Sequence, residues 1–97
     1  MRKDAEKTEG SDLLVRLNKN YKTLSKGQKQ LAAYITKNYD RAAFITASKM
    51  GRIVGVSEST VVRFAYALGY DGYPELQKSL QELIRNKLTS VQRIQLT

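Results

Sequence analysis

The sequence predicts an all-α fold, and three observations lead to this prediction. Apolar residues recur at intervals of three and four along most of the chain, as they do on the buried face of an amphipathic helix. Residue types that cap helices precede several of these segments, and a glycine follows two of them. No stretch shows the sustained alternation of apolar and polar residues that is typical of a half-buried strand. We therefore expect a bundle of five helices.

The composition is that of one small basic domain. Its 97 residues suit a single core, and 17 Lys and Arg against nine Asp and Glu give a net charge of +8. This charge favours a polyanionic partner such as nucleic acid, although a merely solubilising surface would carry it too. Because the chain has no cysteine, it forms neither a disulfide nor a thiolate zinc site, and we expect no metal or cofactor. Without an apolar run of about 20 residues or a signal-peptide stretch, we expect a cytoplasmic location and no membrane association.

Residues 1–11 are polar and rich in charge, which predicts a flexible N-terminal tail. The folded domain is expected to span residues 12–88. A first amphipathic helix begins at Asp12 and ends before Leu24. Its expected apolar face consists of Leu13, Leu14, Leu17, Tyr21 and Leu24.

Ser25 and Gln28 have the spacing of a capping box, so a second helix should begin at Lys26. We expect it to end near Asn38, a residue type that tolerates the left-handed conformation of helix ends. The side chains expected in the core are Leu31, Ala32 and Ile35.

Three further caps precede the next helical segments. Asp40 is expected to cap a short helical turn over residues 41–44, and Thr46 to cap a helix over residues 47–54. After Gly55, Ser57 is expected to cap a helix that runs to Leu68.

The last helix is expected to begin with Pro74, because a first-turn residue needs no amide hydrogen. Gly69 ends the helix before it. Residues 89–97 lack a helix cap, and we interpret them as a linker. The apolar stripe of the last helix is Leu76, Leu80, Leu83, Ile84 and Leu88, opposite the solvent-facing Lys78, Glu82, Arg85 and Lys87.

The segment 47–68 has the pattern of a helix-turn-helix. Gly51 stands where a side chain would collide with the second helix, and Gly55 stands where the turn needs a positive φ. Val56 is expected to fill the turn. A buried helical hairpin without DNA-binding function is the alternative reading. The apolar contacts are Met50 and Val54 on the first helix and Val61, Phe64, Ala65 and Leu68 on the second.

The outer face of the second helix supplies most candidate DNA contacts, because its N-terminal end is the part that enters a major groove. Arg63 can donate to guanine O6 and N7 or to a phosphate, or it can pair with an acidic neighbour such as Glu58 or Asp71. Tyr66 can contact a phosphate or pack on the domain. The candidates on this helix are Ser57, Glu58, Ser59, Thr60, Arg63 and Tyr66.

Three of these candidates have competing local roles. Ser57 is the expected cap, Thr60 can bond its own backbone, and Glu58 suits the positive end of a helix as well as cytosine N4. On the preceding helix, Thr46, Lys49 and Arg52 lie where such motifs hold the sugar-phosphate backbone. A solvated face is the simpler interpretation of Lys22, Lys26 and Lys29.

These blocks resemble the N-terminal domain of the RpiR family of bacterial transcriptional regulators, which are associated with sugar-phosphate metabolism. The resemblance covers residues 12 to about 88. The chain departs from the usual family pattern at four positions. It has Gln28 where the family usually has glutamate, Lys49 where it often has an acidic residue, Gly51 where it usually has alanine and Pro74 where it usually has serine. The matching blocks are Leu24-Ser25, Leu31-Ala32, Tyr34-Ile35, Gly55-Val56-Ser57, Thr60-Val61, Arg63-Phe64, Leu68-Gly69-Tyr70 and Gly72-Tyr73.

The resemblance implies a homeodomain-like DNA-binding domain that precedes a sugar-isomerase-type domain. In the family that second domain binds a phosphosugar and shifts the affinity for DNA. We expect this second domain to be absent from the chain. Any sugar-phosphate effector would then act only through that absent domain. Residues 89–97 would then lead toward it.

The expected function is sequence-specific binding of double-stranded DNA at a palindromic operator. Operator symmetry favours a homodimer, with the first or the last helix as the interface. Enzymatic activity is not expected, because the chain has no histidine or cysteine and no paired carboxylates. The main alternative is a helical module that binds an acidic protein partner.

Overall fold

The computed structural model describes residues 12–96, with side chains described for residues 12–85. Within this range the chain is helical and contains no strand, which confirms the predicted fold class. These residues form six α-helices and the short 3-10 helix η1, one α-helix more than predicted, because the short turn before Thr46 is a helix of its own. The elements are a helix at residues 12–20, the 3-10 helix η1 (Tyr21–Thr23), α2 (Lys26–Lys37), α3 (Tyr39–Ala42), α4 (Ala47–Val54), α5 (Glu58–Ala67) and α6 (Tyr73–Leu96).

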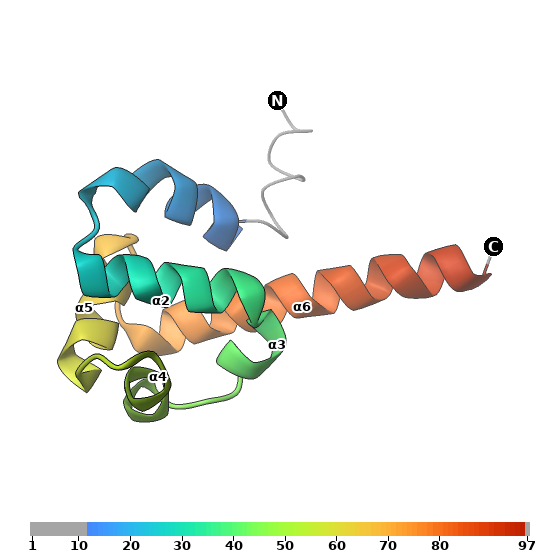
Figure 1. Cartoon of the computed structure of the whole chain (residues 1–97). Helices are drawn as coiled ribbons and strands as arrows, with labels where there is room; N and C mark the ends of the chain where they lie inside the picture. The colour runs from blue at the N-terminus through green and yellow to red at the C-terminus, as the bar shows by residue number, and fades with distance from the viewer. Residues whose placement is uncertain (1–11, 97) are drawn as a thin grey trace.

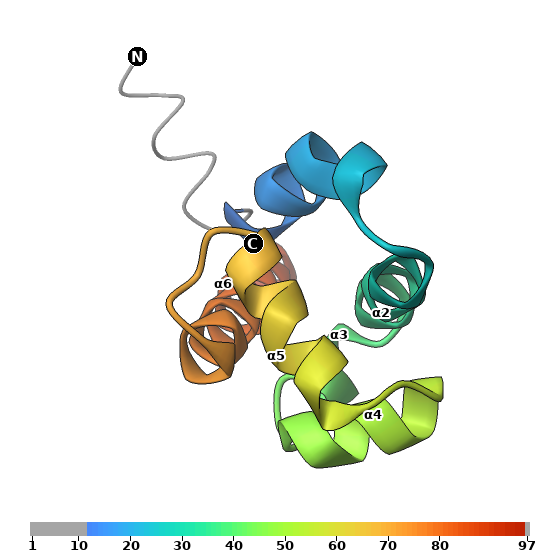
Figure 2. The ribbon, with the colours of Figure 1, turned by 90° about the vertical axis from the view of Figure 1, so that its left-hand side faces the viewer.

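The helices pack around α5 and the first half of α6. Helix α4 packs against α5, and α2 packs against both, while α3 and α5 pack on α6 (Figures 1 and 2). The helix at residues 12–20 buries Leu13 and Leu17 against the same core. The most completely buried large side chains come from all of these helices except α3, and they include Leu31, Met50, Phe64, Leu76 and Leu80.

The start of α2 follows the sequence prediction closely. The Gln28 amide donates to Ser25 Oγ at 3.2 Å, and the Ser25 amide donates to Gln28 Oε1 at 3.0 Å, so the capping box is complete. Gln28 therefore caps the helix, as the sequence predicted. Leu24 is buried as expected, whereas Tyr21 was wrongly placed on the apolar face, because its side chain is 46% exposed.

The chain between α2 and α4 differs from its prediction at two residues. Asn38 follows α2 with a φ of −138°, not a left-handed one, and its side-chain amide donates to the Tyr34 carbonyl at 3.0 Å. It also precedes α3 directly, so Asp40 lies inside the first turn of α3 and does not cap it. Its carboxylate accepts from the adjacent Arg41 amide at 3.0 Å.

Side chains of α6 hold the connection between α3 and α4. The Tyr73 hydroxyl and the Gln77 side-chain amide both donate to the Ile45 carbonyl, at 2.7 and 2.9 Å. The Gln81 side-chain amide donates to the Ala43 carbonyl at 3.0 Å. These three bonds satisfy carbonyls outside regular helix and place the start of α4 relative to α6.

Helix α6 begins one residue earlier and ends later than predicted. Pro74 is its second residue, where the missing amide hydrogen still costs nothing. Helix continues to Leu96 because neither glycine nor proline follows Pro74, so the predicted linker 89–97 is helical where described. Leu76, Leu80 and Leu83 are buried and Ile84 is partly buried, as predicted, with Lys78, Glu82 and Arg85 on the exposed side. The expected tail 1–11 and the side chains of Lys87 and Leu88 lie outside the described residues.

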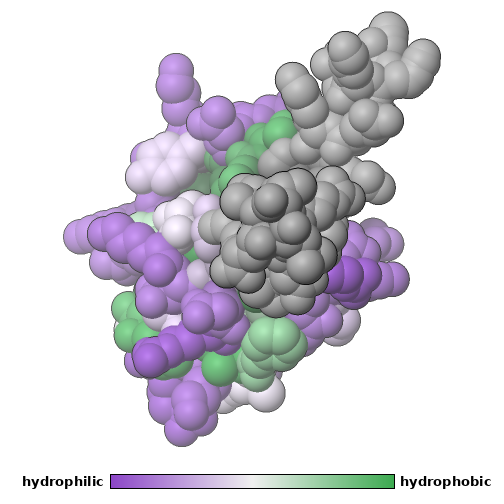
Figure 3. Space-filling view, turned by 90° about the vertical axis from the view of Figure 1, so that its right-hand side faces the viewer, coloured by the Kyte–Doolittle hydropathy of each residue, from purple (hydrophilic) through white to green (hydrophobic). Residues whose placement is uncertain are grey.

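The face from which α6 extends is mainly hydrophilic, with apolar side chains in small separate patches (Figure 3). No helix within residues 12–96 combines the length and the apolar character needed to cross a bilayer.

Candidate nucleic-acid interface

The turn between α4 and α5 is built on two glycines. Gly55 has a φ of 91°, the left-handed conformation predicted for it, and it ends α4. The amides of Gly55 and Val56 both donate to the Gly51 carbonyl, at 2.7 and 2.8 Å. A Cβ atom on Gly51 would lie 2.6 Å from the Val56 carbonyl oxygen. Gly51 therefore allows the turn to close directly onto α4.

The crowding at Gly51 was predicted correctly, but its partner was not. The atoms nearest to a Cβ at this position belong to the backbone of Val56 and Ser57, in the turn that precedes α5. Backbone atoms cannot rotate away as a side chain can. An alanine at this position would therefore meet a turn that lies too close to α4.

Val56 fills the turn by packing against α2. A Cβ atom on Gly27 would lie 3.2 Å from Val56 Cγ1 and 3.6 Å from Thr60 Cγ2. Val56 is partly buried and joins the main core, as predicted. The first turns of α2 and α5 consequently lie side by side.

Helix α5 buries one side and exposes the other. Val61, Phe64 and Ala65 are fully buried and Leu68 is 2% exposed, which confirms the predicted stripe. The helix ends at Ala67, one residue before the predicted end, and Gly69 follows with a φ of 91°. Figure 2 shows α5 facing the viewer in the middle of the bundle, with α4 next to it.

The six candidate residues on α5 and at its cap all reach the accessible side. Five are exposed, and Thr60 is partly buried. Ser59, Arg63 and Tyr66 follow one another at intervals of four and three, so they form a continuous outer stripe. The exposed five are Ser57, Glu58, Ser59, Arg63 and Tyr66.

Ser57 and Thr60 have the local role that the sequence suggested. Ser57 Oγ accepts from the Thr60 amide at 3.1 Å and lies 2.9 Å from the Thr60 hydroxyl. Both hydroxyls therefore stabilise the start of α5. Ser59 has no such bond within the described residues, so its hydroxyl stays available for a partner.

Arg63 is an exposed cation on the outer stripe of α5. Within residues 12–85 its guanidinium forms no hydrogen bond or ion pair, so the suggested pairing with Glu58 or Asp71 is not observed. A free guanidinium on the outer face of a helix can donate two parallel hydrogen bonds to a base edge or a phosphate.

Helix α4 adds two exposed cations beside the turn. Thr46 Oγ1 accepts from the Lys49 amide at 3.0 Å, which confirms the predicted cap. The side chains of Lys49 and Arg52 are exposed and line a shallow depression with Ile53, which is 48% exposed. The helix-turn-helix thus presents exposed positive charge on both of its helices.

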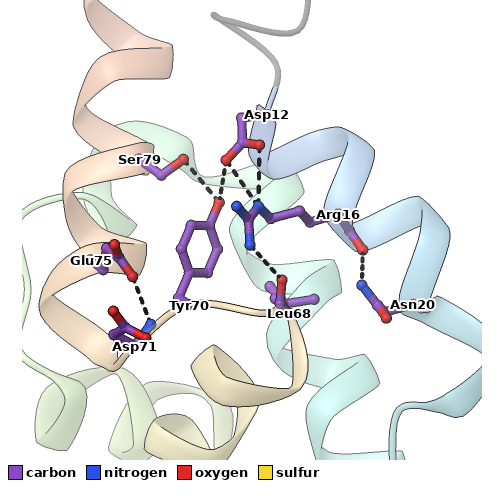
Figure 4. A network of polar contacts seen from close by, with 8 residues as sticks. All are labelled: Asp12, Arg16, Asn20, Leu68, Tyr70, Asp71, Glu75 and Ser79. Carbon is purple, nitrogen blue, oxygen red and sulfur yellow. Dashed lines mark hydrogen bonds and ion pairs between the residues drawn. The ribbon is translucent and has the colours of Figure 1, made fainter.

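The carboxyl end of α5 is held by a polar network that the sequence reasoning missed (Figure 4). Arg16, in the first helix, donates through its Nη1 atom to the Leu68 carbonyl at 3.0 Å. Its Nε atom lies 3.1 Å from both carboxylate oxygens of Asp12, and its guanidinium stacks 4.3 Å from the centre of the Tyr70 ring. The first helix is therefore bonded to the last turn of α5.

Tyr70 extends the same network to α6. Its hydroxyl donates to Asp12 at 3.0 Å and lies 3.0 Å from Ser79 Oγ, which can donate in return. Burial raises the pKa of Tyr70 to about 12, so the hydroxyl keeps its hydrogen at neutral pH. The only signal in the sequence is the spacing of Asp12 and Arg16, which allows an i,i+4 pair. The partners 52 and 58 residues away depend on the tertiary fold.

The described residues contain no cluster of three or more acidic side chains that could hold a metal ion. What they present is a glycine turn between two helices, an exposed stripe on the second helix and exposed cations on both. These features define a helix-turn-helix domain of the DNA-binding class.

The chain belongs to the RpiR family, because residues 11–87 match the family described as "Helix-turn-helix domain, rpiR family". It is 35% identical over 74 residues to YfhH of Escherichia coli, an HTH-type transcriptional regulator, covering 76% of this chain and 26% of YfhH. It is 31% identical over 71 residues to the HTH-type transcriptional regulator HexR of Pseudomonas aeruginosa, covering 73% of this chain and 25% of HexR. The chain thus spans about a quarter of the length of these relatives. No solved structure matched it significantly.

Proposed function

We propose that this domain binds an operator with α5 in the major groove and α4 against the sugar-phosphate backbone. The observation that carries the proposal is the outer stripe of α5, where the side chains of Ser59 and Arg63 have no hydrogen-bonding partner among the side chains and backbone described for residues 12–85. Ser59 and Arg63 would read base edges. Thr46, Lys49 and Arg52 would lie at the flanking phosphates, together with the Ser57 cap. Glu58 and Thr60 would lie at the edge of the DNA major groove, where α5 enters it.

The whole regulator would control genes of sugar or sugar-phosphate metabolism, as the RpiR resemblance implies. Its effector would act through a second domain, and two copies would bind a palindromic operator with recognition helices about 34 Å apart. We further propose that it works in the cytoplasm and catalyses no reaction. These proposals rest on membership of a family of transcriptional regulators.

Salt dependence distinguishes DNA binding from the alternative of a module for an acidic protein partner. If about five phosphates are contacted, log affinity for a duplex should fall with log salt at a slope of about −4 to −5. Fluorescence anisotropy with a labelled palindromic duplex and a scrambled duplex, over a salt series, measures both slope and preference. Equally negligible binding to both duplexes at low salt would refute the proposed function.

Arg63→Ala tests the reading role of α5. If Arg63 contacts a base, the variant should lose about 1 to 3 kcal/mol of binding free energy and its preference at one operator position. Arg41→Ala is the charge-matched control, because Arg41 is exposed on α3, which packs on α2 and α6. Binding to a panel of single-position operator variants gives the preference. An unchanged preference with weaker binding would reassign Arg63 to a phosphate.

A further inference from the structure

A polar groove lies beside the carboxyl end of α5, between this helix and the helix at residues 12–20. Its volume is about 480 Å³. One wall contains Arg16, Lys19 and Asn20, and the other contains Tyr66 and Leu68. Figure 4 shows Arg16, Asn20 and Leu68 side by side in this region. The groove is separate from the depression on α4 at the other end of the motif.

The hydrogen bonds around the groove leave Lys19 as its uncommitted cation. Asp12 compensates the charge of Arg16 in a close ion pair, and Arg16 also donates to the Leu68 carbonyl. Asn20 donates its side-chain amide to the Arg16 carbonyl at 2.9 Å. Lys19 is exposed and has no hydrogen bond or ion pair within residues 12–85. The walls are thus held in place, and among the described residues that line the groove Lys19 is the cation that can add net positive charge for an incoming anion.

Tyr66 connects the groove to the proposed reading stripe. It continues the line of Ser59 and Arg63, and it is 57% exposed. At 1.5 Å per residue, the seven residue steps from Ser59 to Tyr66 span about 10 Å. The major groove is about 12 Å wide. When the amino end of the stripe reaches base edges, its carboxyl end therefore lies near a phosphate strand.

We propose that this groove receives a phosphodiester of the DNA strand opposite the one bound by α4. Lys19 supplies the charge through its ammonium group, and Tyr66 donates its hydroxyl to a phosphate oxygen. Arg16 acts as a positioning residue that fixes the wall. The inference rests on the proposed function, and it extends the DNA-contacting surface to a helix outside the helix-turn-helix.

The test is Lys19→Gln, with Lys37→Gln as the matched control. Both lysines are exposed, but Lys37 is the last residue of α2, far from the first turn that lies beside α5. In the Lys19 variant the magnitude of the salt slope should fall by about 0.9, which corresponds to the loss of one phosphate contact. The variant should also bind the duplex about five- to tenfold more weakly at 0.1 M salt. The Lys37 variant should keep the slope and affinity of the unchanged chain. Circular dichroism and thermal unfolding should be the same for all three proteins, since both sites are on the surface.

Tyr66→Phe provides a second measurement. It keeps the ring and removes the hydroxyl, so it should weaken binding, and its effect should be smaller when Lys19 is already replaced, because both groups serve one phosphate. Equal slopes for the Lys19 and Lys37 variants, with the unchanged chain still binding the duplex, would overturn this inference alone. A chain that binds no duplex would instead overturn the proposed function, and the inference with it.

Discussion

Replacing Phe64 by alanine is expected to lower the free energy of unfolding by about 3 to 5 kcal/mol. The Phe64 side chain is fully buried on the inner side of α5, where α2, α4 and α6 all pack against that helix. Removing the ring leaves a cavity that three helices must collapse to fill. A domain of this size is typically stable by about 5 to 15 kcal/mol, so the variant should be near the limit of folding. Urea denaturation followed by circular dichroism measures the change.

Tyr66→Ala is the control for Phe64, because it removes a ring from the outer side of the same helix. Tyr66 is 57% exposed, so its loss should change the free energy of unfolding by less than about 1 kcal/mol. The dependence of the free energy of unfolding on urea concentration should be similar in both variants. The difference between them would then lie in the stability of the folded state. A comparable loss at Tyr66 would contradict the assignment of inner and outer faces to α5.

Side chains at Gly51 should destabilise the domain in a graded series. Gly51→Ala gains up to about 1 kcal/mol in helix propensity but places Cβ 2.6 Å from the Val56 carbonyl oxygen. We expect a net loss of about 1 to 3 kcal/mol, and about 3 kcal/mol or more for Gly51→Val, whose branch adds to the clash. Chemical denaturation gives the free energies of unfolding. DNA affinity should fall in the same order, because the clash alters the turn that orients α5.

Ser48→Ala is the matched control in α4. Ser48 is exposed on this helix, so an alanine at this position meets no neighbouring backbone. The variant should gain a small stabilisation from helix propensity alone. If Gly51→Ala were as stable as Ser48→Ala, the turn would be able to move away from α4. The close approach of the turn would then not be a requirement of the fold.

The helix boundaries were predictable where a side chain acts on its own backbone. Ser25, Thr46 and Ser57 each accept the amide hydrogen bond expected of a cap, and Gly55 and Gly69 adopt the expected positive φ. Such interactions reach three or four residues, so local sequence contains all of their partners. Asn38 shows the limit of this reasoning, because the immediate start of α3 decided its conformation.

The exposure of the candidate interface residues was predictable from the sequence, but the groove beside them was not. The inner and outer sides of α5 follow from the helical period, and the accessible positions of Ser59, Arg63 and Tyr66 agree with it. The groove beside Tyr66 was not predictable, because its other wall belongs to a helix more than forty residues earlier. Nothing in the spacing of Lys19 distinguishes it from the other solvated lysines.

The sequence by itself determined the helical class, most of the caps and the glycine turn, because these depend on contacts within one or two helical turns. Family membership also follows from the sequence, since the same short blocks carry the match. Only the tertiary structure decided that Gly51 meets the turn backbone and that Arg16 bonds the end of α5. It also decided that two side chains of α6 donate hydrogen bonds to the carbonyl of Ile45. The physical reason is that these contacts join residues far apart in the chain, and their geometry is set by how the whole core packs.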